Sequence, residues 1–153
     1  MKKGIDVSHH QGVIDWARVA ASGEVEFAIL RASFGWGNPA QIDRRVQNNI
    51  AGCTAAGIPY GFYHYSYAKT PDEAREEAKL FLSAVAGSKP QYPLALDFED
   101  PSQMSLTGAE MRAVCRAFLE AVEAAGYAPM LYSTASLLEG PLTLVPLITT
   151  NCR

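Results

Sequence analysis

Several features that would assign a function class are missing from this sequence of 153 residues. No apolar run approaches the roughly 18 residues of a membrane-spanning helix, so we expect no membrane partner. There is no basic run either, and a net charge of −3 offers little to neutralise phosphates, so we expect no nucleic-acid partner. Lys2 and Lys3 are followed by Asp6, His9 and His10, whereas a secretory signal would continue with an apolar segment. We therefore expect that export, if it occurs, uses another route.

Cysteine is scarce, and Cys53, Cys115 and Cys152 form an odd number without metal-type spacing. They indicate neither a closed disulfide framework nor a zinc site, and we expect free thiols. With 48% hydrophobic and 19% charged residues, the composition is that of an ordinary globular protein. The length suits one core, and no repeat or linker is visible, so residues 1–153 are predicted to form a single domain.

Short apolar runs alternate with helical patterns along the chain, which is typical of parallel strands joined by right-handed crossovers. Strands are expected at residues 4–8, 27–32, 58–65, 93–99 and 128–133. Helices are expected between them at residues 16–22, 41–56, 71–86 and 108–125. The predicted fold class is therefore α/β.

Two of the expected helices begin with strong local signals. Thr70 is followed by Glu73, and Thr107 by Glu110, which is the capping-box spacing. In this arrangement the hydroxyl and the carboxylate satisfy backbone N–H groups that the first turn leaves unpaired. Apolar residues then recur at helical spacing, and a glycine closes each segment.

The most informative residues for function are carboxylates at the ends of predicted strands. Asp97 and Glu99 are two residues apart, so in a strand their side chains lie on the same side. Asp6 ends the first predicted strand, and sites of parallel α/β proteins lie at this edge. Crowded like charges in a partly dry pocket raise one pKa, which gives a proton donor beside an ionised neighbour.

Other interpretations of these acids remain open. Asp97, Glu99 and Asp100 could be solvated loop acids or helix caps. Asp6, Asp97, Glu99 and His64 could together offer hard ligands to a metal ion, although His64 has the opposite strand parity from its tyrosine neighbours. We expect no metal and no cofactor.

Aromatic residues near the predicted strand ends favour a carbohydrate site. They suit a groove that stacks sugar rings next to an acid that protonates a glycosidic oxygen. About half of the aromatic cluster is expected only to pack, because strand alternation turns half of it into the core. No serine lies in a G-x-S-x-G elbow, which argues against a serine hydrolase. The candidate groove residues are Trp36, Tyr63, Tyr65 and Tyr132.

Taken in order, these segments resemble the glycoside hydrolase family 25 lysozymes, the Chalaropsis-type N-acetylmuramidases. Each segment alone is a weak signal, whereas the ordered combination is specific. The segments that carry the resemblance are residues 4–12, 14–16, 27–32, 57–64, 96–99 and 126–133.

This resemblance implies hydrolysis of the β-1,4 bond between N-acetylmuramic acid and N-acetylglucosamine in peptidoglycan glycan strands. By position, Glu99 would be the general acid/base, and Asp97 would orient the substrate acetamido group as it attacks the anomeric carbon. Asp6 would tune the site and hold the sugar. Such substrate-assisted, retaining catalysis is an exception to the two-carboxylate scheme. The substrate-binding residues implied in the same way are Tyr63, Tyr132 and Arg31.

The resemblance also implies closing strands that carry a Trp-x-Ala-x-Tyr type segment and a further aspartate. In this sequence, residues 146–149 are not followed by such a segment. We therefore expect a TIM-like (β/α) barrel of the irregular family 25 type that is incomplete, with one wall of the cleft absent. Such an edge favours self-association or a partner chain. The alternative function is a weak or inactive carbohydrate-binding pseudoenzyme. Action is expected at the cell wall, after release from the cytoplasm.

Overall fold

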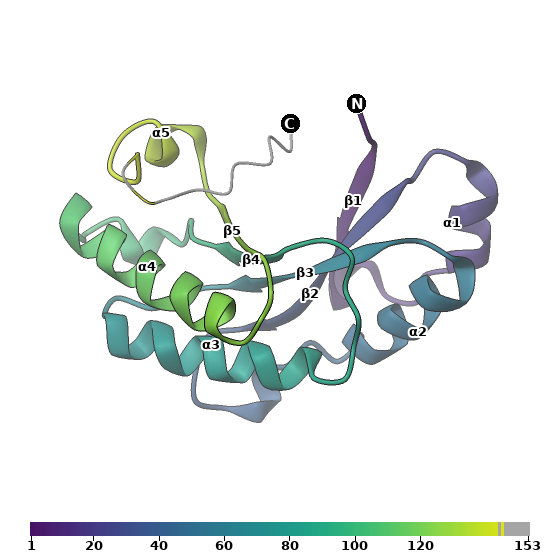
Figure 1. Ribbon diagram of the computed structural model, residues 1–153, viewed down its shortest axis with the longest axis horizontal. Helices are drawn as coiled ribbons and strands as arrows, with labels where there is room; N and C mark the ends of the chain where they lie inside the picture. Colours follow the sequence, from purple (N-terminus) through teal and green to yellow (C-terminus); the bar gives the residue numbers. More distant parts are fainter. Residues whose placement is uncertain (144, 146–153) are drawn as a thin grey trace.

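The computed structural model describes residues 1–143 and 145, and within them the chain forms one parallel sheet flanked by helices (Figure 1). The strand order is β1-β2-β3-β4-β5, so each strand pairs with its neighbours in the sequence. The strands are β1 (Gly4–Val7), β2 (Phe27–Phe34), β3 (Tyr60–Tyr65), β4 (Leu94–Asp97) and β5 (Pro129–Tyr132). The predicted α/β class is confirmed.

The helices cover one side of this sheet. Helices α3 and α4 lie side by side, α3 against β2 and β3 and α4 against β4 and β5, whereas α1 and α2 pack together at the other end (Figure 1). The α-helices are α1 (Trp16–Ser22), α2 (Val46–Ala56), α3 (Pro71–Val85), α4 (Gly108–Ala124) and α5 (Ala135–Leu138). Short 3-10 turns follow β1, β2 and β4, at His9–Gln11, Pro39–Gln41 and Pro101–Gln103.

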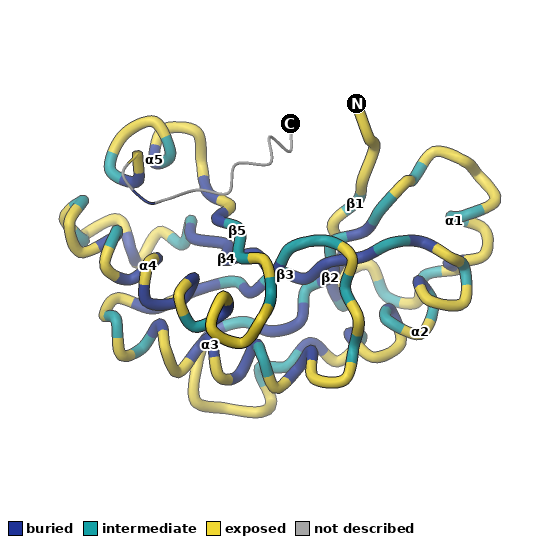
Figure 2. The backbone as a smooth tube through the Cα atoms, in the orientation of Figure 1, coloured by how far each residue is buried: buried dark blue, intermediate teal, exposed yellow. Residues whose placement is uncertain are grey.

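Alternation along the strands gives the sheet two different faces. Leu30, Phe62 and Leu96 point toward the helices and are fully or almost fully buried, and the strands accordingly form the dark centre of Figure 2. The opposite face carries no helix in the described part of the chain and lines a hollow. Among residues 1–143 and 145, β1 and β5 each have a single strand neighbour, so the barrel that these residues form is open, as predicted.

Local capping explains where the long helices begin. Thr107 and Glu110 form the predicted capping box at the start of α4. Thr70 accepts a hydrogen bond from the Glu73 amide, but the Glu73 carboxylate accepts one from the amide of Lys69 instead of Thr70. Both helices therefore start where the sequence predicts.

Most strand boundaries differ from the prediction by one or two residues, and β4 ends at Asp97, before the predicted end at residue 99. Two larger differences concern helices. Helix α2 begins at Val46, five residues after the predicted start at 41, because the preceding residues bind to the end of β2. Ile42 forms an antiparallel bridge with Ser33, and the Asp43 amide donates to the Ala32 carbonyl. The short helix α5 was not predicted, since it has four residues and no side-chain cap.

The described thiols, Cys53 and Cys115, are buried and free, as predicted. Burial raises the pKa of each to about 12, so neither is a reactive thiolate at neutral pH. Cys152 and most of the uncharged segment 141–150 lie outside the described residues. In the part of the chain that is described, no helix is long and apolar enough to cross a membrane.

Candidate active site

The open face of the sheet encloses a cavity of ≈ 650 Å³ that collects most of the predicted site residues. Strand register explains this, because Tyr65 of β3 pairs with Asp97 of β4, which in turn pairs with Tyr132 of β5. Residues at such paired positions point to the same face of a sheet. Lys2 and Tyr92 also line the cavity, and its polar residues at or near the ends of the strands are Asp6, Tyr63, Tyr65, Asp97, Glu99 and Tyr132.

Asp97 is the most perturbed carboxyl group of the site. It is the last residue of β4 and is 7% exposed, and within the described structure its Oδ1 atom has no hydrogen-bond partner. Burial, the largest cause, and the negative charges of Glu99 and Asp6 together raise its pKa to about 7. Asp97 is therefore partly protonated at neutral pH.

Glu99 lies two residues beyond the end of β4, yet its side chain lines the same cavity as Asp97. The backbone on either side of it is fixed. Before it, the Phe98 amide donates to the Tyr132 carbonyl at 2.9 Å, and Ser133 Oγ donates to the Phe98 carbonyl. After it, Asp100 caps the 3-10 turn that follows. A half-buried carboxyl group on a fixed backbone is suited to proton transfer at a defined point.

Asp6 reaches the cavity from the edge strand β1 and is exposed. Its charge acts on Asp97, Tyr63 and Tyr132, as their pKa shifts reveal. Three carboxyl groups from two strands that are not neighbours thus share one hollow.

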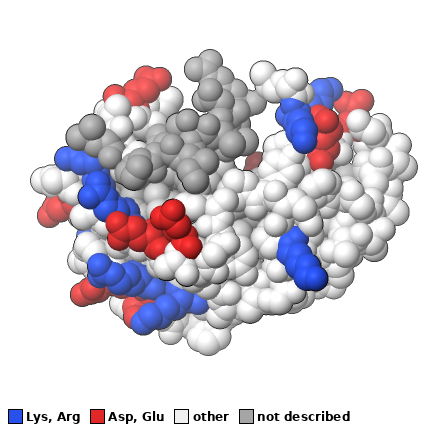
Figure 3. Space-filling model, viewed as in Figure 1, with Lys and Arg blue, Asp and Glu red and all other residues white. Residues whose placement is uncertain are grey.

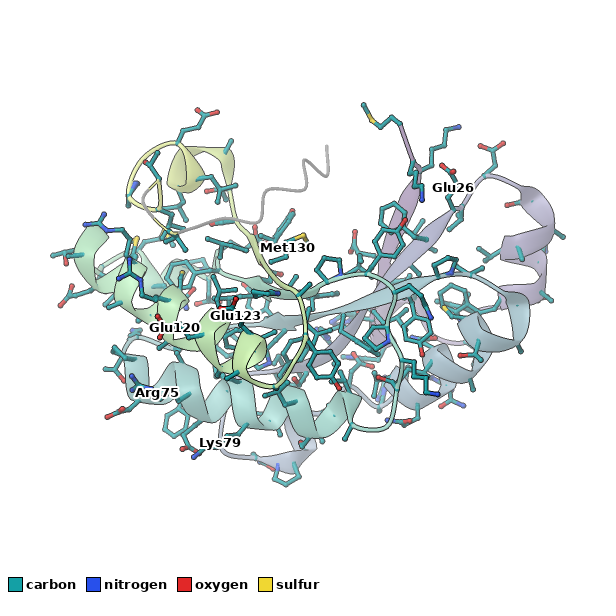
Figure 4. The ribbon with its side chains drawn as sticks, viewed as in Figure 1. Glu26, Arg75, Lys79, Glu120, Glu123 and Met130 are labelled. Atoms are coloured by element: carbon teal, nitrogen blue, oxygen red, sulfur yellow. The ribbon has the colours of Figure 1, made fainter. Side chains whose placement is uncertain are left out.

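Tyrosine side chains form the remaining polar wall. Burial raises the pKa of Tyr63 to about 12, so its hydroxyl keeps its proton. Tyr65 donates a hydrogen bond to Asp100 at 3.1 Å. Tyr132 is 50% exposed, which leaves its ring free to contact a ligand. Met130 of β5, labelled in Figure 4, adds apolar surface to the same cavity. Trp36, 47% exposed in the loop after β2, does not line the cavity.

Arg31 lies next to this cavity but is tied to another acid. Its Nε donates to Asp43 at 2.9 Å, and its guanidinium contacts the His9 ring. His9 contacts the same Asp43 oxygen through its amide at 3.0 Å and through Nδ1 at 3.1 Å. Burial opposes ionisation of Asp43, but hydrogen bonds from Arg45, His9 and Arg31 hold its pKa below the usual range. Asp43 was missed because no strand or motif pattern surrounds it.

His64 lies on the helix-facing side of the sheet, away from the cavity, and is fully buried. The ligand set of the metal interpretation is therefore not assembled. Among residues 1–143 and 145, no group of three or more His, Cys, Asp or Glu side chains could hold a metal ion. Basic and acidic side chains are interspersed on the face shown in Figure 3, without a basic stripe among the described residues.

Fold and site together define a class: a barrel-type α/β protein with acids and tyrosines at the carboxyl ends of its strands. The sequence model described as "Glycosyl hydrolases family 25" matches residues 5–144. The chain belongs to this family.

Relatives and solved structures agree with this assignment. YegX of Escherichia coli strain K12, described as uncharacterized, is 33% identical over 137 residues, which cover 86% of this chain and 48% of YegX. The lysozyme of Streptococcus phage Cp-7 is 30% identical over 131 residues, covering 84% of this chain and 34% of that protein. The modular autolysin LytC of Streptococcus pneumoniae superimposes with a TM-score of 0.81 at 30% identity, covering 93% of this chain and 34% of LytC. The chain thus spans about half or less of each.

Proposed function

We propose that this chain is a peptidoglycan hydrolase that cleaves the β-1,4 bond between N-acetylmuramic acid and N-acetylglucosamine. The observation that carries the proposal is the gathering of Asp6, Asp97 and Glu99 in one open cavity with exposed aromatic surface. Family membership supports it, as does a relative named lysozyme. LytC has also been solved with a synthetic peptidoglycan ligand, and such a substrate implies action at the cell wall.

In the proposed reaction the acids near the cleavage point share a proton. Burial, together with the negative charges of Glu99 and Asp6, raises the pKa of Asp97 to about 7, so near neutrality Asp97 holds a proton that it can pass to Glu99. Glu99 is less buried than Asp97, and it delivers the proton to the glycosidic oxygen as that bond breaks. The N-acetylmuramic acid unit carries both the anomeric carbon and the acetamido group. Its acetamido oxygen forms a bond to this carbon as the glycosidic bond breaks, and ionised Asp97 stabilises the positive charge on the acetamido nitrogen.

A water molecule completes the cycle. The Glu99 carboxylate accepts a proton from water as the water oxygen attacks the anomeric carbon, and the acetamido group is released. Two inversions at this carbon give net retention. Tyr63 and Tyr132 contact the sugar, and Asp6 adds negative charge beside the developing cation. Arg31, the register partner of Tyr63 on β2, places a positive charge next to this part of the cleft.

The test compares the wild-type chain with Glu99→Gln on soluble, uncrosslinked glycan strands. We expect the wild type to release reducing ends, and Glu99→Gln to release none above background while it still binds glycan in a pull-down. If the wild type binds glycan but releases no reducing ends, the chain is a carbohydrate-binding pseudoenzyme. If it neither binds nor cleaves, both interpretations are wrong.

A further inference from the structure

A second polar cluster lies on the opposite side of the sheet, behind the proposed active site. Its members come from β2, β3, the loop after β3, α3 and the turn after β4, and all are 0% exposed. Burying a charged or polar side chain lowers the stability of the fold unless hydrogen bonds compensate for the lost contacts with water. The hydrogen bonds of this cluster therefore need to be followed one by one. The cluster consists of Ser33, His64, Ser66, Glu77 and Gln103.

Glu77 of α3 fixes the chain where it leaves β3. Its Oε2 accepts a hydrogen bond from Ser66 Oγ at 2.6 Å, and its Oε1 accepts one from the Tyr67 amide at 2.8 Å. His64 Nε2 lies 3.4 Å from Oε2, and Nδ1 of the same ring pairs with Ser33 Oγ at 2.8 Å. Both oxygens of the carboxylate are therefore needed as acceptors.

Ser66 connects this carboxylate to the catalytic strand. Its amide donates to the carbonyl oxygen of Asp97 at 3.0 Å. Its Oγ accepts hydrogen bonds from Gln103 Nε2 and from the Ala68 amide, each at 3.2 Å. The hydroxyl has one proton, and because these two neighbours are donors, that proton must go to Glu77.

Gln103 extends the connection to the other side of Glu99. Its Nε2 also donates to the Ala68 carbonyl at 2.9 Å, and its Oε1 accepts from the Asp100 amide at 3.2 Å. An unbroken path of hydrogen bonds thus runs from Glu77 through Ser66 to the backbone of Asp97, and through Gln103 to the backbone of Asp100.

We propose that Glu77, Ser66 and Gln103 are positioning residues that hold the backbone on both sides of Asp97 and Glu99. They are fully buried on the far face of the sheet and do not touch the substrate. Displacement of a catalytic group by about 1 Å can cost about 100-fold in rate, so a rigid connection of this kind matters for turnover. The inference rests on the proposed function.

The sharpest variant is Glu77→Gln. It keeps the size of the side chain, but an amide has one acceptor oxygen, so it can satisfy Ser66 or Tyr67 but not both. Ser66→Ala removes the connecting hydroxyl altogether. The matched control is Val46→Ala, a core truncation on α2 at a residue 1% exposed and outside the path.

Two measurements are made on the wild type and on each variant: kcat and KM on soluble glycan strands, and the titration midpoint of Asp97 by ¹³C NMR. For Glu77→Gln and Ser66→Ala we expect kcat to fall by about 10- to 100-fold with KM unchanged. We expect the Asp97 midpoint to move from about 7 toward 3.8, because a looser strand end admits water. Val46→Ala should lower Tm and leave both values as in the wild type.

The proposal is wrong if Glu77→Gln leaves kcat and the Asp97 midpoint unchanged, or if Val46→Ala changes them equally. If Ser66→Ala does not fold, Glu77→Gln still decides. Should the wild type prove inactive, the proposed function fails, but the Asp97 midpoint still reports whether the path holds the strand end.

Discussion

Replacing Asp97 by Asn tests the electrostatics of the site without any substrate. Burial and the negative charges of Glu99 and Asp6 together raise the pKa of Asp97 from an ordinary value of 3.8 to about 7. At a pH between these two pKa values, Asp97 is ionised in the unfolded chain but still protonated in the folded chain. The stability of the wild type should therefore fall as pH rises from about 4 to about 7, and level off above.

The size of this loss follows from the same two pKa values. At roughly 1.4 kcal/mol for each pKa unit, the full penalty is about 4 kcal/mol, and the open cavity makes this an upper bound. Asn carries no ionisable proton, so the variant lacks this loss. Relative to the wild type, Asp97→Asn should gain stability with rising pH, and the gain should be complete above about pH 7.

Urea unfolding followed by circular dichroism, repeated across this pH range, measures the difference. Glu120→Gln is the control, because Glu120 is an exposed carboxylate on the outer surface of α4 (Figure 4). It should leave the pH dependence of the wild type unchanged. If the stability difference between Asp97→Asn and the wild type is the same at both ends of the range, the raised pKa of Asp97 is wrong.

Three further predictions concern the surroundings of the site. Tyr132→Ala should raise KM on soluble glycan several-fold with kcat nearly unchanged, because the half-exposed ring contributes binding surface; a fall in kcat alone would contradict this. Asp43→Asn should lower the free energy of unfolding by about 3–5 kcal/mol in urea titrations, because it leaves Arg31 and its buried charge without a partner carboxylate. A loss below about 1 kcal/mol would mean that the pair contributes no more than a surface ion pair. Hydrolysis should survive a chelator, since the proposed steps use carboxyl groups, the substrate acetamido group and water; a loss of activity that added metal restores would favour metal-assisted hydrolysis.

Features set by neighbouring residues could be predicted from the sequence. The capping box of Thr107 and Glu110 starts α4 because the contacts involved span a single turn. The two-residue spacing of Asp97 and Glu99 predicts a shared side, and both residues do line the cavity, although β4 ends at Asp97. Strand alternation likewise separates Tyr63 from His64.

Features set by distant contacts could not be predicted in this way. Helix α2 starts late because Ile42 and the Asp43 backbone bind the end of β2, and His9 and Arg31 hold the Asp43 side chain. The hydrogen-bond path through Glu77, Ser66 and Gln103 could not be predicted for a similar reason, since Ser66 and Gln103 belong to no sequence motif. Glu77 did leave a signal, because it falls within the apolar face of α3, where a charged residue needs a partner.

Mass spectrometry of the fragments released from purified peptidoglycan tests the central claim most directly. We predict soluble fragments whose reducing end is N-acetylmuramic acid, produced by the wild-type chain and absent with Glu99→Gln. Fragments that end in N-acetylglucosamine, cleavage of the peptides with the glycan left intact, or equal release by Glu99→Gln would contradict the assignment of Glu99 as the acid that cuts this bond.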